Sequence, residues 1–295
     1  MTSPSTPGGR EKAAWRRRKA RREAWRKVLV FAVLTFGAVL FALPFVWMIS
    51  TSLKSASEVM QVPPSLLPHK VVWSNYPVAL ARLDFPRLLR NTCVIVYSNL
   101  IGQTLSASLV AFGFARLRFP GREPLFFLML STMMLPSMAT LIPVYALYKQ
   151  LGWINTFLPL TLPAYLGGGA FYIFLLRQFF LTLPGELEDA ARMDGCSSFD
   201  VYWRIFLPLS KPALATVAIF SFMGHWNDFI GPLIYLRTPD KYTLALGLQT
   251  FQGLYSTDYN YLMAASVVVV SPVILVFFAA QRYFVKGIVL SGLKG

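Results

Sequence analysis

Residues 28–53 read VLVFAVLTFGAVLFALPFVWMISTSL, a 26-residue stretch without a charged side chain. A helix needs about 20 apolar residues to cross about 30 Å of hydrocarbon, so this stretch is long enough to span a bilayer. Backbone groups in lipid must find hydrogen-bond partners within their own segment, which favours a helix here. The stretch therefore predicts a membrane-spanning helix.

Five more stretches of this kind follow along the chain. They cover residues 91–114, 124–148, 154–176, 212–236 and 262–284. The 295-residue chain is 55% hydrophobic and 14% charged, whereas soluble domains hold about 45–50% apolar and about 25% charged residues. We expect an all-α, polytopic membrane protein in which residues 28–295 form one domain of six transmembrane helices. The composition excludes a soluble enzyme, and the short alternating strands of a membrane barrel are not seen in the sequence.

The sequence contains no motif that is typical of a catalytic site. No G-x-x-x-x-G-K-[ST] motif is present to hold nucleotide phosphates. The histidines, His69 and His225, and the cysteines, Cys93 and Cys196, are too scattered to give the spacing of a metal site. We therefore expect no catalytic residues, no metal site and no enzymatic activity in this chain.

Basic residues are distributed unevenly along the chain. Segment 1–27 alone carries ten of the 28 Lys and Arg residues. Its run WRRRKARREAWRK would suit nucleic acid or anionic lipid, but a basic flank before a span is more typical of a tail held in the cytoplasm. With this tail inside, the inner segments 1–27, 115–123, 177–211 and 285–295, together with Arg282, hold 20 basic residues, and the outer segments 54–90, 149–153 and 237–261 hold eight. We predict that both termini are cytoplasmic.

The connecting segment 181–211 is more patterned than a simple link requires. It reads LTLPGELEDAARMDGCSSFDVYWRIFLPLSK. Pro184 suits the first turn of a helix, and the helix dipole favours the acidic residues that follow it within 186–189. Gly195 can end that helix with a left-handed backbone.

A second short helix is predicted directly after this glycine. Ser197 and Asp200 have the spacing of an approximate capping box. Aromatic residues then recur at helical spacing and predict one apolar stripe. They are Phe199, Tyr202, Trp203 and Phe206. We expect a helix–turn–helix with one face against the membrane domain and its turn directed at a cytosolic partner.

These residues resemble the EAA loop of ABC importer permeases. That family carries Glu-Ala-Ala, three residues, Gly, nine residues and then Ile-x-Leu-Pro in its penultimate cytoplasmic loop. The matching residues here are Asp189, Ala190, Ala191, Gly195, Ile205, Leu207 and Pro208. The one departure is the aspartate at position 189 in place of glutamate, with Glu188 beside it.

The resemblance covers about residues 28–295 and points to the carbohydrate-uptake branch, which includes the maltose transporter permeases. It is carried by FARLRFPG after the second span, by PPSLLP and WSNYP in the first outer segment, by SKPALATVAIFSFMGHWNDFIGPLIYL and by the closing AAQRYFVKGIVLSGLKG. It implies a MetI-like bundle in the bacterial inner membrane that forms half of a path for a sugar or related polyol.

The resemblance also implies partners for this chain. A second, related permease would complete the path, two ATPase subunits would hold ATP and Mg²⁺, and an extracytoplasmic binding protein would deliver the substrate. This chain would need no cofactor of its own. It would dock on the ATPase through the coupling residues Glu188, Asp189, Ala190, Ala191, Gly195, Ile205, Leu207 and Pro208.

A second polar feature lies within the fifth predicted span. Residues 224–229 read GHWNDF, and Asp228 is the only carboxylate in the six predicted spans. Ionisable residues in a membrane usually face a cavity or a partner. We therefore propose four candidates for the wall of the path: His225, Trp226, Asn227 and Asp228. A hydrogen bond between helices, or contact with water at the headgroups, is the structural alternative.

One function of another class is left open by the residues alone. An ion-gradient-driven secondary transporter or channel could use His225 and Asp228 as a relay. This alternative lacks the inverted repeat of many such proteins, and it leaves segment 181–211 without a role.

Overall fold

The structure is a computed structural model that describes residues 9–253 and 257–292. Its longer helices are α1 (Gly9–Ser52), α4 (Phe85–Arg116), α5 (Arg122–Ser131), α6 (Ser137–Gln150), α8 (Ala170–Thr182), α12 (Lys211–Trp226) and α15 (Tyr259–Gly292). Shorter helices are α2 (Ala56–Val59), α3 (Asn75–Arg82), α7 (Leu158–Thr161), α9 (Glu186–Met193), α10 (Ser198–Asp200), α11 (Leu207–Leu209), α13 (Ile230–Tyr235) and α14 (Leu244–Gly247). Single turns are η1 (Thr132–Met134), η2 (Leu162–Tyr165), the π-helical η3 (Val201–Phe206), η4 (Pro239–Lys241) and η5 (Leu248–Phe251). The predicted all-α fold class is confirmed.

Several of these helices are long and apolar enough to cross a membrane. Four single segments qualify by length and composition: Arg21–Ser52, Phe85–Arg116, Leu158–Thr182 and Tyr259–Gln281. Two bent pairs also qualify: Arg122–Met134 with Ser137–Gln150, at 99°, and Ser198–Leu209 with Lys211–Trp226, at 77°. The described residues thus contain four candidate spans, or six if each bent pair is one span.

Proline explains the bend within residues 124–148, where the sequence predicts one span. The helix stops at Leu135 and Pro136, whose backbones are extended with ψ of 121° and 129°. Proline has no amide hydrogen to continue the helix, and its ring disfavours a helical backbone in the preceding residue. The predicted span 212–236 is interrupted as well, because α12 ends at Trp226 and α13 begins at Ile230.

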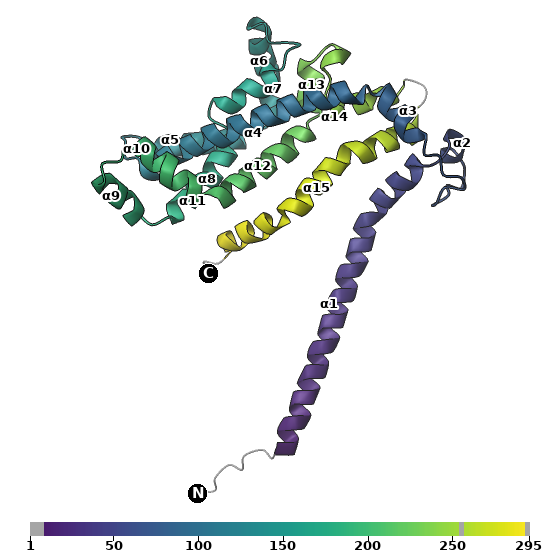
Figure 1. The fold of residues 1–295 in the computed structure, drawn as a ribbon, viewed down its shortest axis with the longest axis horizontal. Helices are drawn as coiled ribbons and strands as arrows, with labels where there is room; N and C mark the ends of the chain where they lie inside the picture. The colour runs from purple at the N-terminus through teal and green to yellow at the C-terminus, as the bar shows by residue number, and fades with distance from the viewer. Residues whose placement is uncertain (1–8, 254–256, 293–295) are drawn as a thin grey trace.

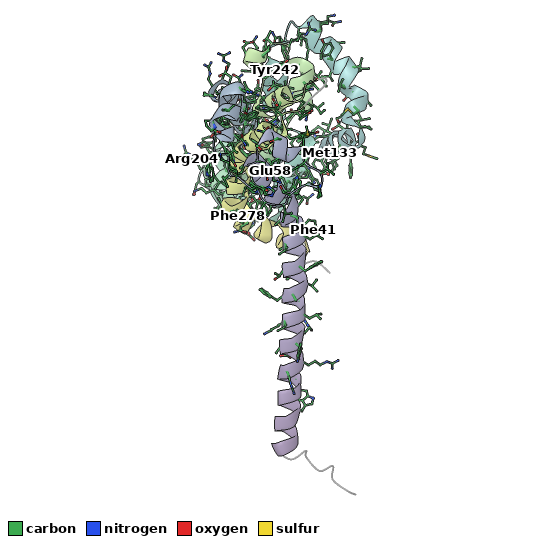
Figure 2. All side chains as sticks on the ribbon, turned by 90° about the vertical axis from the view of Figure 1, so that its right-hand side faces the viewer. Phe41, Glu58, Met133, Arg204, Tyr242 and Phe278 are labelled. Atoms are coloured by element: carbon green, nitrogen blue, oxygen red, sulfur yellow. The ribbon has the colours of Figure 1, made fainter. Side chains whose placement is uncertain are left out.

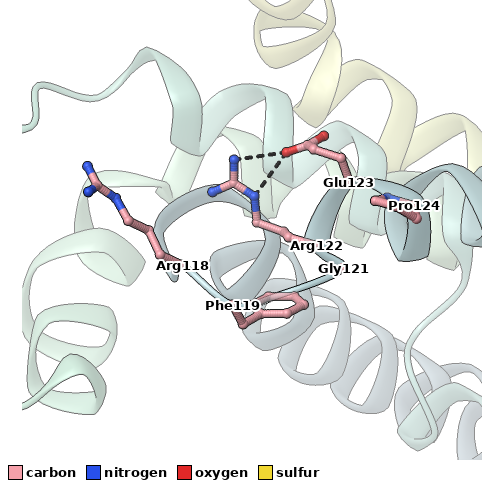
Figure 3. A pocket seen from close by; sticks show the side chains of 6 residues that line it. All are labelled: Arg118, Phe119, Gly121, Arg122, Glu123 and Pro124. Atoms are coloured by element: carbon pink, nitrogen blue, oxygen red, sulfur yellow. Dashed lines mark hydrogen bonds and ion pairs between the residues drawn. The ribbon is translucent and has the colours of Figure 1, made fainter.

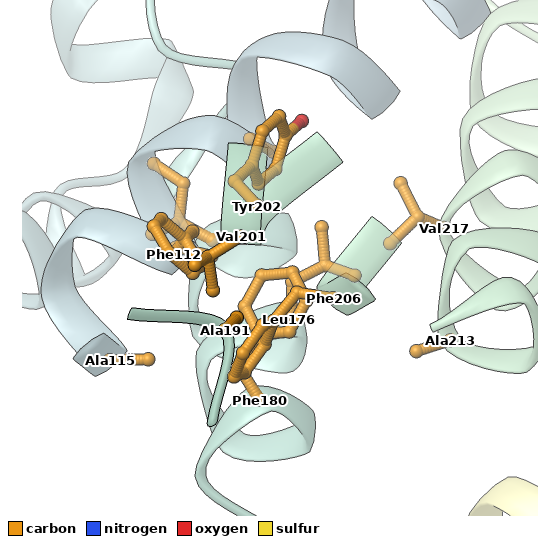
Figure 4. Close-up of a cluster of buried hydrophobic side chains, with 13 residues drawn as sticks. Phe112, Ala115, Leu176, Phe180, Ala191, Val201, Tyr202, Phe206, Ala213 and Val217 are labelled. Atoms are coloured by element: carbon orange, nitrogen blue, oxygen red, sulfur yellow. The ribbon is translucent and has the colours of Figure 1, made fainter. Parts of the chain in front are cut away.

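A buried hydrophobic core lies where α4, α8 and α12 meet segment 181–211 (Figure 4). Phe112, Phe180 and Phe206 meet edge to face, with ring centroids 5.2 to 6.3 Å apart. Nearby, the buried hydroxyl groups of Tyr202 and Ser108 lie 2.7 Å apart. These contacts fix segment 181–211 to the bundle.

Helix α1 leaves the bundle along most of its length. Figures 1 and 2 show it as a rod that meets the rest of the chain near its Ser52 end. There the Ser52 hydroxyl lies 2.8 Å from the Tyr76 hydroxyl, and Asn75 Nδ2 donates to the Ser52 carbonyl at 2.8 Å. None of its most apolar window is buried within the chain, so α1 presents its apolar surface to its surroundings.

Loss of the Phe206 ring is expected to loosen this core. Phe206 is fully buried, and large-to-small changes at such sites cost about 3–5 kcal/mol. We expect Phe206→Ala to lower the thermal unfolding temperature of the purified protein in detergent. Phe199→Ala is the matched control, because the Phe199 side chain is 62% exposed. Equal unfolding temperatures for the two variants would contradict this reading of the core.

Candidate functional site

Segment 181–211, called the coupling segment from here on, forms the turn predicted from its residues. Helix α9 is followed by Gly195 with φ of +80° and by a reciprocal capping box between Ser197 and Asp200. Ser197 Oγ accepts from the Asp200 amide at 3.2 Å, and Asp200 Oδ2 accepts from the Ser197 amide at 3.2 Å. The Ser197 hydroxyl also donates to Asp200, which holds the pKa of that carboxyl below its usual value.

The predicted aromatic stripe runs from α10 into the π-helical turn η3, and its two halves differ in burial. Tyr202 and Phe206 are 3% and 0% exposed and face the bundle. Phe199 and Trp203 are 62% and 51% exposed, and their rings stack with centroids 6.3 Å apart. The Phe199 and Tyr202 rings also lie 6.0 Å apart, so the predicted stripe is present but only its Tyr202 and Phe206 half is buried.

The predicted coupling residues also divide between the bundle and the surface. Asp189, Ala190, Gly195 and Pro208 are exposed, Ala191 is buried in the core, and Glu188, Ile205 and Leu207 are half-buried. The carboxylate of Glu188 pairs with Arg192 at 2.8 Å, one helical turn away, which supports α9. Sequence reasoning did not single out Met193, which is 88% exposed beside the turn. Exposed Met and aromatic side chains are typical of protein interfaces.

The four candidate path residues lie at the break between α12 and α13, in different surroundings. Trp226 is buried, stacks on Phe222 and donates from Nε1 to the Val269 carbonyl of α15 at 3.0 Å. Asn227 is exposed and donates back to its own helix, at the carbonyl of Met223. His225 is half-buried in the last turn of α12. The four side chains are therefore not gathered on one surface.

Asp228 contacts Gly231, a residue in the wall of a groove between α6 and α13 that sequence reasoning missed. Its Oδ1 accepts from the Gly231 amide at 3.0 Å, which caps the first turn of α13. The groove, of about 240 Å³, is lined by Ser137, Met138, Thr140, Leu141, Val144, Ile230, Gly231, Ile234 and Tyr235. Pro136 precedes the α6 wall and Pro232 lies within the α13 wall, and these two prolines are the sequence signal that could have indicated the groove.

Aromatic rings continue from this groove toward the loop that follows α6. Tyr235 stacks on Tyr145 with centroids 6.4 Å apart and meets Tyr148 edge-on at 5.4 Å. Tyr148 in turn stacks on Trp153 at 5.4 Å. Rings of this kind, beside hydroxyl groups and a carboxylate, can contact the apolar faces and the hydroxyl groups of a sugar.

Asn155 joins the two loops at this end of the groove. Its backbone has φ of +62°, and its Oδ1 accepts from the amides of Arg237 and Thr238 at 3.1 and 3.3 Å. Lys241 Nζ donates to the Asn155 carbonyl at 2.6 Å, and Arg237 Nη2 donates to the Tyr145 hydroxyl at 2.7 Å. These bonds hold α6 and α13 in a fixed relation.

Comparison with known proteins identifies the family. Residues 103–289 match the family described as binding-protein-dependent transport system inner membrane component. The chain belongs to this family. It is a permease of the ABC importer type, as the EAA resemblance predicted, and the match includes the whole coupling segment.

Relatives of this permease align over nearly their full lengths. The arabinooligosaccharide transport permease AraQ of Halalkalibacterium halodurans is 33% identical, over 92% of this chain and 97% of AraQ. The sn-glycerol-3-phosphate transport permease UgpE of Agrobacterium fabrum is 33% identical, over 89% and 96%. The lactose transport permease LacG of Rhizobium radiobacter is 31% identical, over 88% and 94%.

A solved structure has the same fold as this permease. A chain of a bacterial ABC transporter for the acidic polysaccharide alginate superposes with a TM-score of 0.79 at 25% identity. The alignment covers 90% of this permease and 98% of that chain. The predicted ABC importer permease bundle is therefore confirmed. Family membership also decides against the ion-gradient-driven alternative, and it makes this permease an inner-membrane protein.

Proposed function

We propose that this permease forms half of the translocation path of an ATP-driven importer for a sugar or a related polyol. The observation that carries the proposal is the coupling segment, which is buried on one side in the bundle through Phe206 and exposed on the other through Met193 and Trp203. Relatives named for the transport of arabinooligosaccharides, lactose and glycerol phosphate support the substrate class.

Energy comes, in this proposal, from two ATPase subunits that hold ATP and Mg²⁺. Within the described residues, no group of three or more His, Cys, Asp and Glu residues could hold a metal ion. The exposed side of the coupling segment docks on an ATPase. Because Tyr202 and Phe206 are packed against α4 and α8, a displacement of the docked turn moves those helices as rigid bodies.

A second permease chain completes the path. Helix α1 supports this part of the proposal, because its apolar window has no cover within the chain. Lipid alone could cover such a surface, but a partner bundle gives α1 a packed neighbour on the side away from α15. An extracytoplasmic binding protein, implied by the family description, delivers the substrate.

The substrate passes, we propose, by the groove between α6 and α13. The Tyr235 ring provides an aromatic face in its wall, and the Asp228 carboxylate, bonded to the Gly231 amide of that wall, provides a nearby hydrogen-bond acceptor. His225, in the last turn of α12, lies three residues before Asp228 and is a second polar group at this break, outside the residues that line the groove. Such a lining suits polyhydroxylated ligands, which present both hydroxyl groups and apolar ring faces.

Reconstitution of the complete complex in lipid vesicles tests the proposal. The probes are labelled lactose, an arabinooligosaccharide and glycerol 3-phosphate, each presented with the cognate binding protein. We expect uptake of at least one probe that requires ATP on the coupling-segment side of the membrane. Uptake that persists without ATP, or an ATPase that does not co-purify with this permease, would contradict the proposal.

Orientation in the membrane is expected to place both termini in the cytoplasm. The uneven distribution of Lys and Arg supports this topology. In a background without Cys93 and Cys196, we expect Ser57→Cys to react with a membrane-impermeant maleimide added to intact cells. Lys19→Cys should react only after permeabilisation. Both side chains are exposed, so access depends on the side of the membrane. Labelling of Lys19→Cys in intact cells would contradict the predicted topology and place the N-terminal tail outside.

A further inference from the structure

A pocket lies at the turn between α4 and α5, at the same end of the bundle as the coupling segment. It has a volume of about 430 Å³ and is lined by Arg118, Phe119, Gly121, Arg122, Glu123 and Pro124 (Figure 3). Helix α4 ends at Arg116 and α5 begins at Arg122, so the turn joins two predicted spans. The pocket therefore lies at the level expected for lipid headgroups rather than in the hydrocarbon.

Positive charge exceeds negative charge in this pocket. The Glu123 carboxylate is 2.9 Å from Arg122 and 3.3 Å from Arg177, and it is the only acidic group among the lining residues. Arg177 is further held by the Phe126 ring, 4.0 Å beneath its guanidinium. Two arginines thus share one carboxylate, which leaves the cluster positive before Arg118 is considered.

Arg118 is the arginine that the structure leaves available. Figure 3 shows Arg122 turned toward Glu123, with Arg118 apart from that pair. Within the described part of the chain, the exposed Arg118 side chain has neither an ion pair nor a hydrogen bond. A guanidinium presents several N–H donors in a planar fork, which matches the geometry of a phosphate.

The backbone at the pocket adds to this preference for an anion. Helix α5 starts there after Gly121, and no side chain caps its first turn. The Arg122 amide already donates to the Phe119 carbonyl at 3.4 Å and Pro124 has no amide hydrogen, so the attraction for an anion comes from the helix dipole. The site thus combines the dipole of the ten-residue helix α5 with the exposed guanidinium of Arg118 and the surplus charge of Arg122 and Arg177.

Apolar surface continues from the pocket along α5. Phe119 at its rim is 38% exposed, and further along α5 Leu125, Phe127 and Leu128 are 49%, 66% and 64% exposed. A ligand that filled the whole surface would need an anionic head and an apolar tail. A soluble anion such as inorganic phosphate would use only the charged part.

We propose that this pocket binds the phosphate group of an anionic phospholipid, whose acyl chains lie along α5. Basic pockets between transmembrane helices are known to suit such headgroups. The lipid headgroup would lie beside Arg177 of α8, a helix that also packs against the coupling segment.

Lipid selectivity of the complete complex in nanodiscs tests the proposal. The probe is spin-labelled phosphatidylglycerol, compared with spin-labelled phosphatidylcholine, and the readout is the motionally restricted fraction of each. We expect Arg118→Ala to lower the preference for phosphatidylglycerol about fivefold, which corresponds to about 1 kcal/mol for one basic residue. Arg118→Lys should retain much of the preference, because the charge is kept.

Arg87→Ala is the matched control, because Arg87 is an exposed arginine at the opposite end of α4. It should leave the preference unchanged. Equal preferences in the wild type, Arg118→Ala and Arg118→Glu would overturn the proposal. If millimolar inorganic phosphate displaced the labelled lipid, and both lipids were retained equally, the pocket would be a site for a soluble anion. That result would overturn the lipid proposal. If Arg118→Ala lost the co-purified ATPase but kept its lipid selectivity, the lipid proposal would be overturned, and Arg118 would instead be assigned to the contact with the ATPase.

Discussion

Replacing Gly195 with valine is expected to abolish substrate-stimulated ATP hydrolysis in the assembled importer. Gly195 has φ of +80°, where an L side chain costs about 1–2 kcal/mol. A Cβ there would meet no atom within 4 Å, so the strain comes from the backbone alone. The turn between α9 and α10 must then rearrange, and this rearrangement tilts α9 on the ATPase while the spans stay intact.

Gly195→Asn is the matched control for this change. Asparagine adopts the left-handed conformation more readily than other residues with a Cβ, so coupling should largely survive. The measurements are ATPase co-purification, and ATPase activity with and without loaded binding protein, in reconstituted membranes. Full stimulation in Gly195→Val would show that the geometry of this turn does not matter.

Asp189→Lys is also expected to abolish substrate-stimulated ATP hydrolysis. Asp189 is exposed in the first turn of α9, where the helix dipole favours an acid and opposes a lysine by about 0.3–1 kcal/mol. The change also reverses the charge presented to the ATPase. We expect weaker ATPase retention and loss of stimulated hydrolysis, whereas Asp189→Glu should preserve both. Normal coupling in Asp189→Lys would remove this residue from the docking surface.

Removing the polar pair at the break in the fifth predicted span should impair transport with the complex intact. We expect Asp228→Ala combined with His225→Ala to lower the rate of uptake about tenfold or more, since a hydrogen bond to a charged group contributes about 1.5–3 kcal/mol. The measurement is uptake of labelled substrate into vesicles, with co-purification of the partner subunits as a check on assembly.

Asp228→Asn separates a structural role from a transport role. Asparagine caps helices about as well as aspartate, so the bond to the Gly231 amide should persist while the charge is lost. Reduced uptake in this variant would assign the effect to the carboxylate in the path. Asn227→Ala is the control, because Asn227 bonds only within its own helix. Wild-type uptake in the double alanine variant would reduce the pair to structural residues.

The sequence was sufficient for features that depend on a few neighbouring residues. Residue types within the EAA-type loop predicted helix α9, the left-handed glycine and the capping box of Ser197 and Asp200, all of which are present. Backbone sterics and capping act over three or four residues, so they can be read from the order of the side chains. The apolar stretches likewise determined the fold class, because their length and composition alone exclude other folds.

Only the tertiary structure decided which of these side chains are covered. Phe199 and Phe206 belong to one predicted stripe, yet the first is exposed and the second is buried against α4 and α8. Trp226 and Asp228 are two residues apart, yet Trp226 bonds to α15 and Asp228 bonds to Gly231 of α13 in the wall of a groove. Burial depends on which distant helix packs at each position, and that contact is set by the whole bundle rather than by local spacing.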